Sequence, residues 1–287
     1  MRRLFDRMAM DLVLAGYSEC TRRNYLMHAK RFARHYQRSP EDLGKNHIRE
    51  FLFYLIEHHH VSRATVRQVR AALRFLYCVT LGRPQEIDWL PPARHQKALP
   101  VVLSGTEVAD LFAAVRHQMY RSILMTMYSG GLRITEACRL LPEDIDSKRM
   151  LIHVRCGKGG VDRYTILSRR LLAQLRYYWT HCRTHYGGYL FPGRTRLRHA
   201  CPQTVRNVFR LALQDAGIKK DVTPHVLRHC FATHLLELGY DVTMVQALLG
   251  HRNLRSTMCY AHVSASRVPR DASPLDCLGT PQAVALG

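Results

Sequence analysis

The fold of this chain is decided by the stretch between residues 225 and 260, which contains the runs HVLRHCFATH (225–234) and LLGH (248–251) and then Tyr260. The first run predicts a helix that starts at Pro224 and stops before Gly239, with Thr223 as its N-cap. His225 and Arg228 are three positions apart, so they project from one face of this helix. The helix dipole adds positive potential at this end, which favours a bound phosphate.

Further reactive side chains stand on both sides of this helix. Arg133 follows a glycine pair, Lys158 lies in the glycine-rich run CGKGG (156–160), and His251 follows the end of a second predicted helix. Glu136, three residues after Arg133, is interpreted as a buried ion-pair partner that orients the arginine rather than as a base. With Tyr260, the set supplies a phenol, two imidazoles and three cations, which suit nucleophilic attack on a phosphodiester.

The composition indicates a basic, well-packed protein of two domains. The 287 residues are 47% hydrophobic and carry a formal charge of +21, from 43 basic and 22 acidic side chains. Residues 1–100 hold 18 basic and 9 acidic residues, and the remainder holds 25 and 13, so the excess is spread over the chain. Nucleic acid is the polyanion expected first for such a protein, and both halves are expected to contact it.

The first 80 residues read as all-helical, with apolar residues at helical spacing over 21–36, 46–59 and 62–79, and with Ser62 as an N-cap. The last of these helices also carries a stripe of basic residues without interleaved acids: Arg63, Arg67, Arg70 and Arg74. A solvated face is one interpretation of such a stripe. We expect instead that these arginines contact DNA, because solubility alone does not require four cations in a row.

A proline-rich stretch over 82–103 predicts an interdomain linker. Ser104 and Glu107 form a capping box that opens the second domain. In that domain, β-rich runs over 150–155 and 161–167 predict a hairpin whose turn holds Lys158. Helices are expected near 106–116, 119–129, 134–140, 168–186, 202–216, 224–238 and 241–249.

These motifs resemble one known family. The chain is similar to the tyrosine recombinases of the phage-integrase and Xer-like group, whose pattern Arg … Lys … His-x-x-Arg … His/Trp … Tyr is met in order by Arg133, Lys158, His225, Arg228, His251 and Tyr260. The resemblance covers residues 100–263 strongly and residues 1–80 less specifically. It implies a mainly α fold with a small β-sheet, in two domains.

The resemblance also assigns boundaries. It implies an N-terminal helical, SAM-like core-binding bundle over 1–81, the linker over 82–103, and an α+β catalytic domain over 104–287. The prolines after residue 263 depart from the long C-terminal helix that such proteins often exchange, so an irregular tail is expected from about residue 264.

Roles for single residues follow from the same resemblance. Tyr260 would attack a DNA phosphate to form a 3′-phosphotyrosyl bond, and Arg133 and Arg228 would clamp the non-bridging oxygens. Lys158 would give a proton to the leaving 5′-oxygen. His225 would assist proton transfer at the tyrosine, and His251 would donate a hydrogen bond to the phosphate.

Partners and alternatives complete the expectations. The expected partners are double-stranded DNA with a specific core site and further copies of this chain, which would form a homotetramer on the DNA. The resemblance also allows a related recombinase or an accessory protein as a partner. No membrane is expected, since no run approaches about 18 apolar residues. No metal or cofactor is expected either, since acidic residues near the motifs are scarce and a phosphotyrosine stores the bond energy. A bacterial-type cytoplasmic, nucleoid-associated location is expected. The alternatives are a type IB topoisomerase and a catalytically inactive DNA-binding relative.

Overall fold

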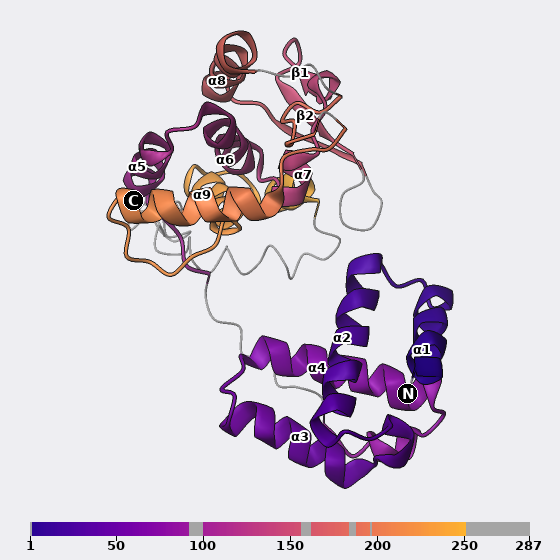
Figure 1. The fold of residues 1–287 in the computed structure, drawn as a ribbon. Coiled ribbons are helices and arrows are strands. Elements are labelled where there is room, and N and C mark those ends of the chain that lie inside the picture. Colours follow the sequence, from indigo (N-terminus) through magenta and orange to yellow (C-terminus); the bar gives the residue numbers. More distant parts are fainter. Residues whose placement is uncertain (1, 92–99, 156–161, 184–187, 196, 251–287) are drawn as a thin grey trace, which may run out of the picture. The chain divides into compact units, whose positions relative to one another are not determined.

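The computed structural model describes residues 2–91, 100–155, 162–183, 188–195 and 197–250, and these fall into two compact units, Met1–Lys97 and Ala98–Gly287 (Figure 1). Both ends of the stretch expected as a linker pack within a unit. Ile87 is fully buried in the first core and Leu103 in the second. Among the described residues, no helix is long and apolar enough to cross a membrane.

The first unit is a helical bundle (Figure 1), in agreement with the all-helical expectation. Its helices are α1 (Arg2–Leu14), α2 (Glu19–Tyr36), α3 (Lys45–Glu57) and α4 (Arg63–Phe75), with the short turns η1 (Pro40–Asp42), η2 (Leu76–Thr80) and η3 (Pro84–Glu86). The predicted N-cap is confirmed, because the Ser62 hydroxyl accepts a hydrogen bond from the Thr65 amide at 3.2 Å. Helix α4 packs against α2, which buries its apolar stripe.

A buried tyrosine joins two parts of this bundle. Tyr77, in the π-helical turn η2, is fully buried among aromatic neighbours that include Phe32. Its hydroxyl donates toward the carbonyls of Pro40 and Leu43, at 3.1 and 3.0 Å. The Pro40 carbonyl also accepts from the Leu43 amide at 3.2 Å, so the hydroxyl adds a second donor there and gives the Leu43 carbonyl a donor from η2.

The second unit surrounds helix α6 with other helices and one small sheet. Its helices are α5 (Gly105–Ala114), α6 (Gln118–Gly130), α7 (Ile134–Cys138), α8 (Arg169–Tyr177), α9 (Pro202–Asp215), α10 (Val226–Glu237) and α11 (Val242–Leu249), with the turns η4 (Pro142–Asp144) and η5 (Tyr178–Cys182). The strands are β1 (Ile145–Asp146), β2 (Leu151–Val154) and β3 (Arg163–Ile166), all antiparallel in the order β1-β2-β3.

The mainly α fold with a small β-sheet is therefore confirmed, and so is the capping box at Ser104, whose hydroxyl accepts from the Glu107 amide. The predicted start of helix α10 is wrong by two residues. Pro224 and His225 form a turn in which the Val226 amide donates to the Thr223 carbonyl, so the N-cap is His225 rather than Thr223. The two-residue strand β1 was not expected.

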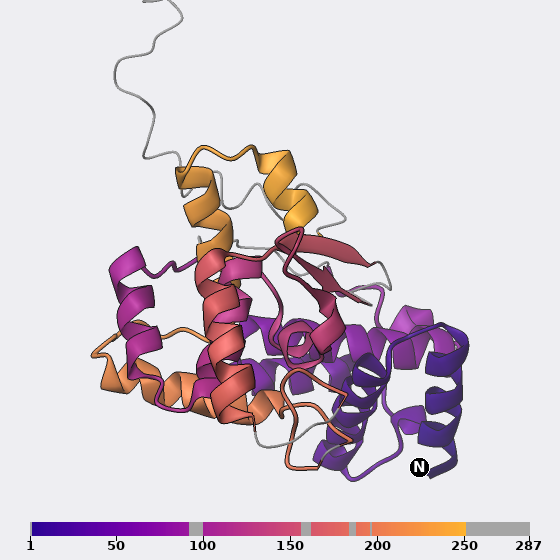
Figure 2. The same cartoon turned by 90° about the horizontal axis from the view of Figure 1, so that it is seen from above.

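Three contacts in the second unit bring distant parts of the chain together. Helix α10 packs along α6, helix α7 follows α6 directly, and strand β3 lies beside α11 (Figure 2). The ends of these five elements thus meet, although more than 100 residues separate the first from the last. Arg133 and Arg228 lie at this meeting point.

A Tyr77→Phe substitution tests the packing of the first unit. Losing the hydroxyl removes the donor that η2 gives to the Leu43 carbonyl and one of the two donors to the Pro40 carbonyl, so we expect the free energy of unfolding to fall by about 1–3 kcal/mol. Urea unfolding followed by circular dichroism measures the change. Tyr17→Phe, at an exposed tyrosine of the same bundle, is the control and should change little. Equal stability of the two variants would contradict the assigned role.

Candidate functional site

Arg133 and Glu136 form the first part of the site, at the junction between α6 and α7. Arg133 is the N-cap residue of α7, and its amide donates to Glu136 Oε2 at 2.9 Å. Its guanidinium Nη1 donates to Glu136 Oε1 at 2.6 Å. The side chain of Glu136 is 7% exposed and that of Arg133 is 24% exposed. The carboxylate therefore orients an arginine that keeps an edge open to solvent, as the spacing predicted.

Arg228 of helix α10 lies beside this pair and is almost completely buried, with 1% of its surface exposed. Its Nη1 donates to the Gly131 carbonyl at 2.5 Å and its Nη2 to the Leu249 carbonyl at 2.7 Å. Nη1 also lies 3.9 Å from Glu136 Oε2. Arg228 thus ties α10 to the end of α6 and to the end of α11, and it places a positive charge next to Arg133.

A third arginine, Arg163 of strand β3, completes the cluster and was not identified from the sequence. Its Nη1 and Nη2 donate to the two Glu136 oxygens at 3.2 and 2.7 Å, and its Nε donates to the Leu248 carbonyl at 3.0 Å. The side chain is 8% exposed. Strand alternation places Arg163 on the inward face of β3 with the buried Thr165, but a strand of four residues is too short for this pattern to single out an arginine from the sequence.

The charge balance of this cluster favours an anion. Burial alone raises the pKa of the Glu136 carboxyl, but hydrogen bonds and charge from Arg163, followed by hydrogen bonds from Arg133, lower it to about 2. Glu136 is therefore ionised at neutral pH. One carboxylate faces three guanidinium groups, and the carbonyl end of helix α11 offsets part of the remaining positive charge. A surplus of positive charge stays at the edge where Arg133 is exposed.

His225 stands at the start of helix α10, next to His229, with ring centroids 4.7 Å apart. Burial disfavours the charged imidazole and lowers the pKa of His225 to about 4, and the charges of His229, Arg228 and Arg133 act in the same direction. At neutral pH the His225 imidazole is uncharged and able to accept a proton.

Gly131 is required where α6 turns toward Arg133. Its φ of +63° is in the left-handed region, and a Cβ at this position would lie 2.5 Å from the Phe231 ring and 2.9 Å from Leu249. The absence of a side chain at Gly131 therefore lets helices α10 and α11 approach the α6–α7 junction closely enough for Arg228 to reach the Gly131 carbonyl.

The other predicted residues are distributed as follows. Lys158, His251 and Tyr260 lie outside the described residues. Arg63, Arg67, Arg70 and Arg74 all lie on α4, as predicted.

The second half of this stripe, Arg70 and Arg74, contacts the segment that follows η3. Arg70 donates to the Pro91 carbonyl, and Arg74 pairs with Asp88 at 3.3 Å. This half of the stripe therefore helps to hold the segment after η3, which the stripe pattern did not predict.

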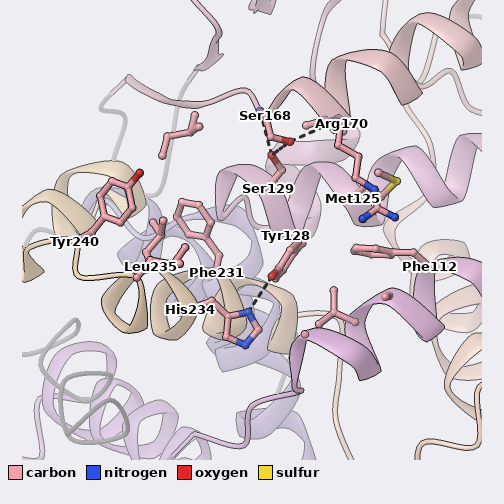
Figure 3. A pocket seen from close by; sticks show the side chains of 16 residues that line it. Phe112, Met125, Tyr128, Ser129, Ser168, Arg170, Phe231, His234, Leu235 and Tyr240 are labelled. Carbon is pink, nitrogen blue, oxygen red and sulfur yellow. Dashed lines mark hydrogen bonds between the residues drawn. The ribbon is translucent and has the colours of Figure 1, made fainter. Parts of the chain in front are cut away.

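A separate apolar pocket of about 400 Å³ opens between α5, α6, α8 and α10 (Figure 3). Its polar groups satisfy one another, since the Tyr128 hydroxyl pairs with His234 at 2.9 Å and the Ser129 hydroxyl donates to Ser168 at 3.0 Å. Of the predicted catalytic residues that the structure describes, Arg133, His225 and Arg228, none lines this pocket. Within the described ranges, no three His, Cys, Asp or Glu side chains are grouped so that they could hold a metal ion. The arginine cluster is therefore the candidate site.

Two family models match the chain. The model described as the phage integrase family matches residues 102–267, and the model described as the phage integrase N-terminal SAM-like domain matches residues 4–87. The first contains the arginine cluster, and the second covers the helical bundle of the first unit.

Individual proteins are similar along nearly the whole chain. The protein y4qK of Sinorhizobium fredii (strain NBRC 101917 / NGR234), provisionally named an integrase/recombinase, is 39% identical over 287 residues, covering 98% of this chain and 91% of y4qK. Tyrosine recombinase XerA of Thermococcus kodakarensis is 35% identical over 265 residues, covering 90% and 89%. A lambda integrase tetramer solved on a Holliday junction has the same fold, with a TM-score of 0.74 at 19% identity over 90% of this chain and 76% of that one.

Glu136→Gln tests the ionised state of the cluster. Because the carboxyl pKa is lowered from 4.5 to about 2, ionisation of Glu136 contributes on the order of 3 kcal/mol to stability. That contribution is fully present above pH 4.5 and is lost as the pH falls toward 2. The gap in unfolding free energy between wild type and variant should therefore narrow over this range, as measured by urea unfolding at a series of pH values.

The matched control is Glu143→Gln, at an exposed carboxylate that pairs with Arg155 at the surface. It should lower stability little at any pH. A Glu136→Gln effect that stays constant from neutral to acid pH would contradict the ionised, arginine-bound carboxylate.

Proposed function

This chain belongs to the phage integrase family and is a site-specific DNA recombinase, and we propose that it cuts and rejoins DNA through a covalent bond to Tyr260. The observation that carries the proposal is the arginine cluster, in which Arg133 and Arg228 are fixed around Glu136. The motif order along the chain and the match of both family models support it.

The proposed covalent step exchanges one phosphoester bond for another. The phenol oxygen of Tyr260 forms a bond to the scissile phosphorus, the bond from phosphorus to the 5′-oxygen breaks, and the DNA strand keeps a 3′-phosphotyrosyl end. The phenol loses its proton and the leaving 5′-oxygen gains one. With a pKa near about 10, the phenol is protonated at neutral pH, so nearby cations and a base are needed to make its oxygen a nucleophile.

The described residues suit different parts of this step. The exposed edge of Arg133 would contact a non-bridging phosphate oxygen, where developing charge is stabilised by a fixed cation. Arg228 holds two backbone carbonyls in this structure, so it contributes charge and the position of its neighbours. The neutral His225 would accept the phenol proton. By family resemblance, Lys158 would protonate the 5′-oxygen and His251 would hydrogen-bond the phosphate.

The partners proposed are double-stranded DNA with a specific core site and a homotetramer on that DNA, working at the nucleoid in the cytoplasm as part of a mobile element. A related recombinase or an accessory protein would join it at some sites. The tetramer is supported by the family and by the lambda integrase tetramer of the same fold. Arg63 and Arg67 would contact the DNA backbone from α4, while Arg70 and Arg74 also hold the segment at residues 88–91.

A covalent-trapping experiment tests the chemistry. On a nicked duplex that carries the site selected by the wild-type protein from random DNA, we expect a protein–DNA adduct that resists denaturation. Tyr260→Phe should abolish the adduct while DNA binding remains, because only the nucleophilic oxygen is lost. Tyr240→Phe, at an exposed tyrosine just before α11, is the control and should leave the adduct intact.

An adduct that persists in Tyr260→Phe would contradict the assigned nucleophile. Absence of any wild-type adduct would favour the inactive DNA-binding relative. Relaxation of a supercoiled plasmid that lacks the site, at a rate equal to that of a plasmid containing it, would favour the topoisomerase.

The salt dependence of binding tests the α4 arginines. Each neutralised phosphate contributes about −0.9 to the slope of log Kobs against log [salt]. Arg63→Gln combined with Arg67→Gln should therefore make the slope shallower by about 2, measured by fluorescence anisotropy on a duplex containing the site. Arg23→Gln is the control, because Arg23 pairs with Glu19 on α2 and should not change the slope. An unchanged slope in the double variant would place the DNA elsewhere.

A further inference from the structure

We infer that Arg163 is a positioning residue for DNA cleavage: it fixes Glu136 and the end of helix α11 so that Arg133 faces the scissile phosphate. The inference rests on the proposed function. Arg163 is not assigned to touch the DNA, since its side chain is 8% exposed and its Nε, Nη1 and Nη2 all donate to protein acceptors. It would act through the groups that it holds.

The guanidinium group of Arg163 determines how closely the other two arginines can approach the Glu136 carboxylate. Its two Nη groups occupy both carboxylate oxygens, whereas Arg133 uses one side-chain nitrogen on Oε1. Arg228 stays at 3.9 Å, outside hydrogen-bond distance. Without Arg163, the buried carboxylate would lose its strongest partner and draw the two remaining guanidinium groups toward itself, away from a phosphate.

Arg163 also fixes the end of helix α11. Its Nε holds the Leu248 carbonyl, and the next carbonyl, that of Leu249, is held by Arg228. A Cβ on Gly250, which has a φ of +64°, would lie 2.7 Å from Arg163 Cδ, so the backbone there packs directly on the arginine stem. The proposed residue His251 follows Gly250 in sequence, and Lys158 precedes Arg163 by five residues.

Lysine cannot reproduce this geometry. An ammonium group would offer a point charge to Glu136, but it could not donate to both carboxylate oxygens and to the Leu248 carbonyl in one plane. Arg163→Lys should therefore keep the charge and most of the stability while losing part of the positioning. Arg163→Met removes both the charge and the hydrogen-bond donors, and it keeps the approximate length of the aliphatic side chain.

The experiment measures the single-turnover rate of adduct formation on the nicked site with saturating protein, and the DNA Kd separately. We expect Arg163→Met to lower the rate by about 10²-fold with little change in Kd, and Arg163→Lys to fall between that variant and wild type. The control is Arg121→Met. Like Arg163, Arg121 holds backbone carbonyls at the end of a helix, in this case those of Ala113 and Val115 at the end of α5, and its loss should not lower the rate.

The pH profile gives a readout that general loss of stability would not move. Removing Arg163 takes away the largest influence that lowers the Glu136 pKa, so this pKa should rise. In Arg163→Met, adduct formation should then decline at mildly acidic pH where wild type is still active, because protonated Glu136 no longer orients Arg133. Glu136→Gln should be slow at every pH, without this acid limb.

The outcomes separate the two proposals. If wild type forms no adduct, the proposed function fails, whatever Arg163 does. If wild type forms an adduct that needs Tyr260, and Arg163→Met and Arg163→Lys both match its rate and pH profile, the inference about Arg163 is overturned. If Arg163→Met does not fold, Arg163→Lys decides, and a rate equal to wild type overturns the inference.

Discussion

A single buried carboxylate holds the candidate site together. Glu136 is surrounded by Arg133, Arg163 and Arg228, and a buried charge is tolerated only when it is paired and hydrogen-bonded. Its partners come from the α6–α7 junction, strand β3 and helix α10, and two of them continue to the end of α11. The second unit thus fixes four remote segments through one ionised group.

This constraint has a direct chemical consequence. Three guanidinium groups around one carboxylate leave positive charge that the fold has already oriented, so the proposed binding of a phosphate would require little rearrangement. The three arginines differ in their exposure to solvent. Arg228 and Arg163 are almost fully buried and hold the site in place, whereas Arg133 has an edge that is open to a ligand. The neutral state of His225 has a first cause in burial, which disfavours the charged imidazole, and a second in the neighbouring positive charges, which disfavour a second proton.

Much of this was predictable from the sequence where the signal is local. The spacing of Arg133 and Glu136 predicted their ion pair, and caps such as Ser62 and Ser104 located helix starts. Long-range partners were not predictable. Arg163 lies in a four-residue strand, too short for alternation to single out an inward arginine, and the partners of Arg70 and Arg74 come after a break in regular structure. Pro224 was misplaced because a proline suits a turn as well as a first helical turn.

The most direct test of the central constraint is the titration of Glu136 itself. With selectively ¹³C-labelled glutamate, the carboxyl carbon of Glu136 can be assigned by comparison with Glu136→Gln and followed by NMR as the pH is lowered. A carboxylate held by three arginines should keep its ionised chemical shift until the pH approaches its pKa of about 2. A midpoint at the ordinary glutamate value of 4.5 would contradict the account, because Glu136 would then not be bound by the cluster.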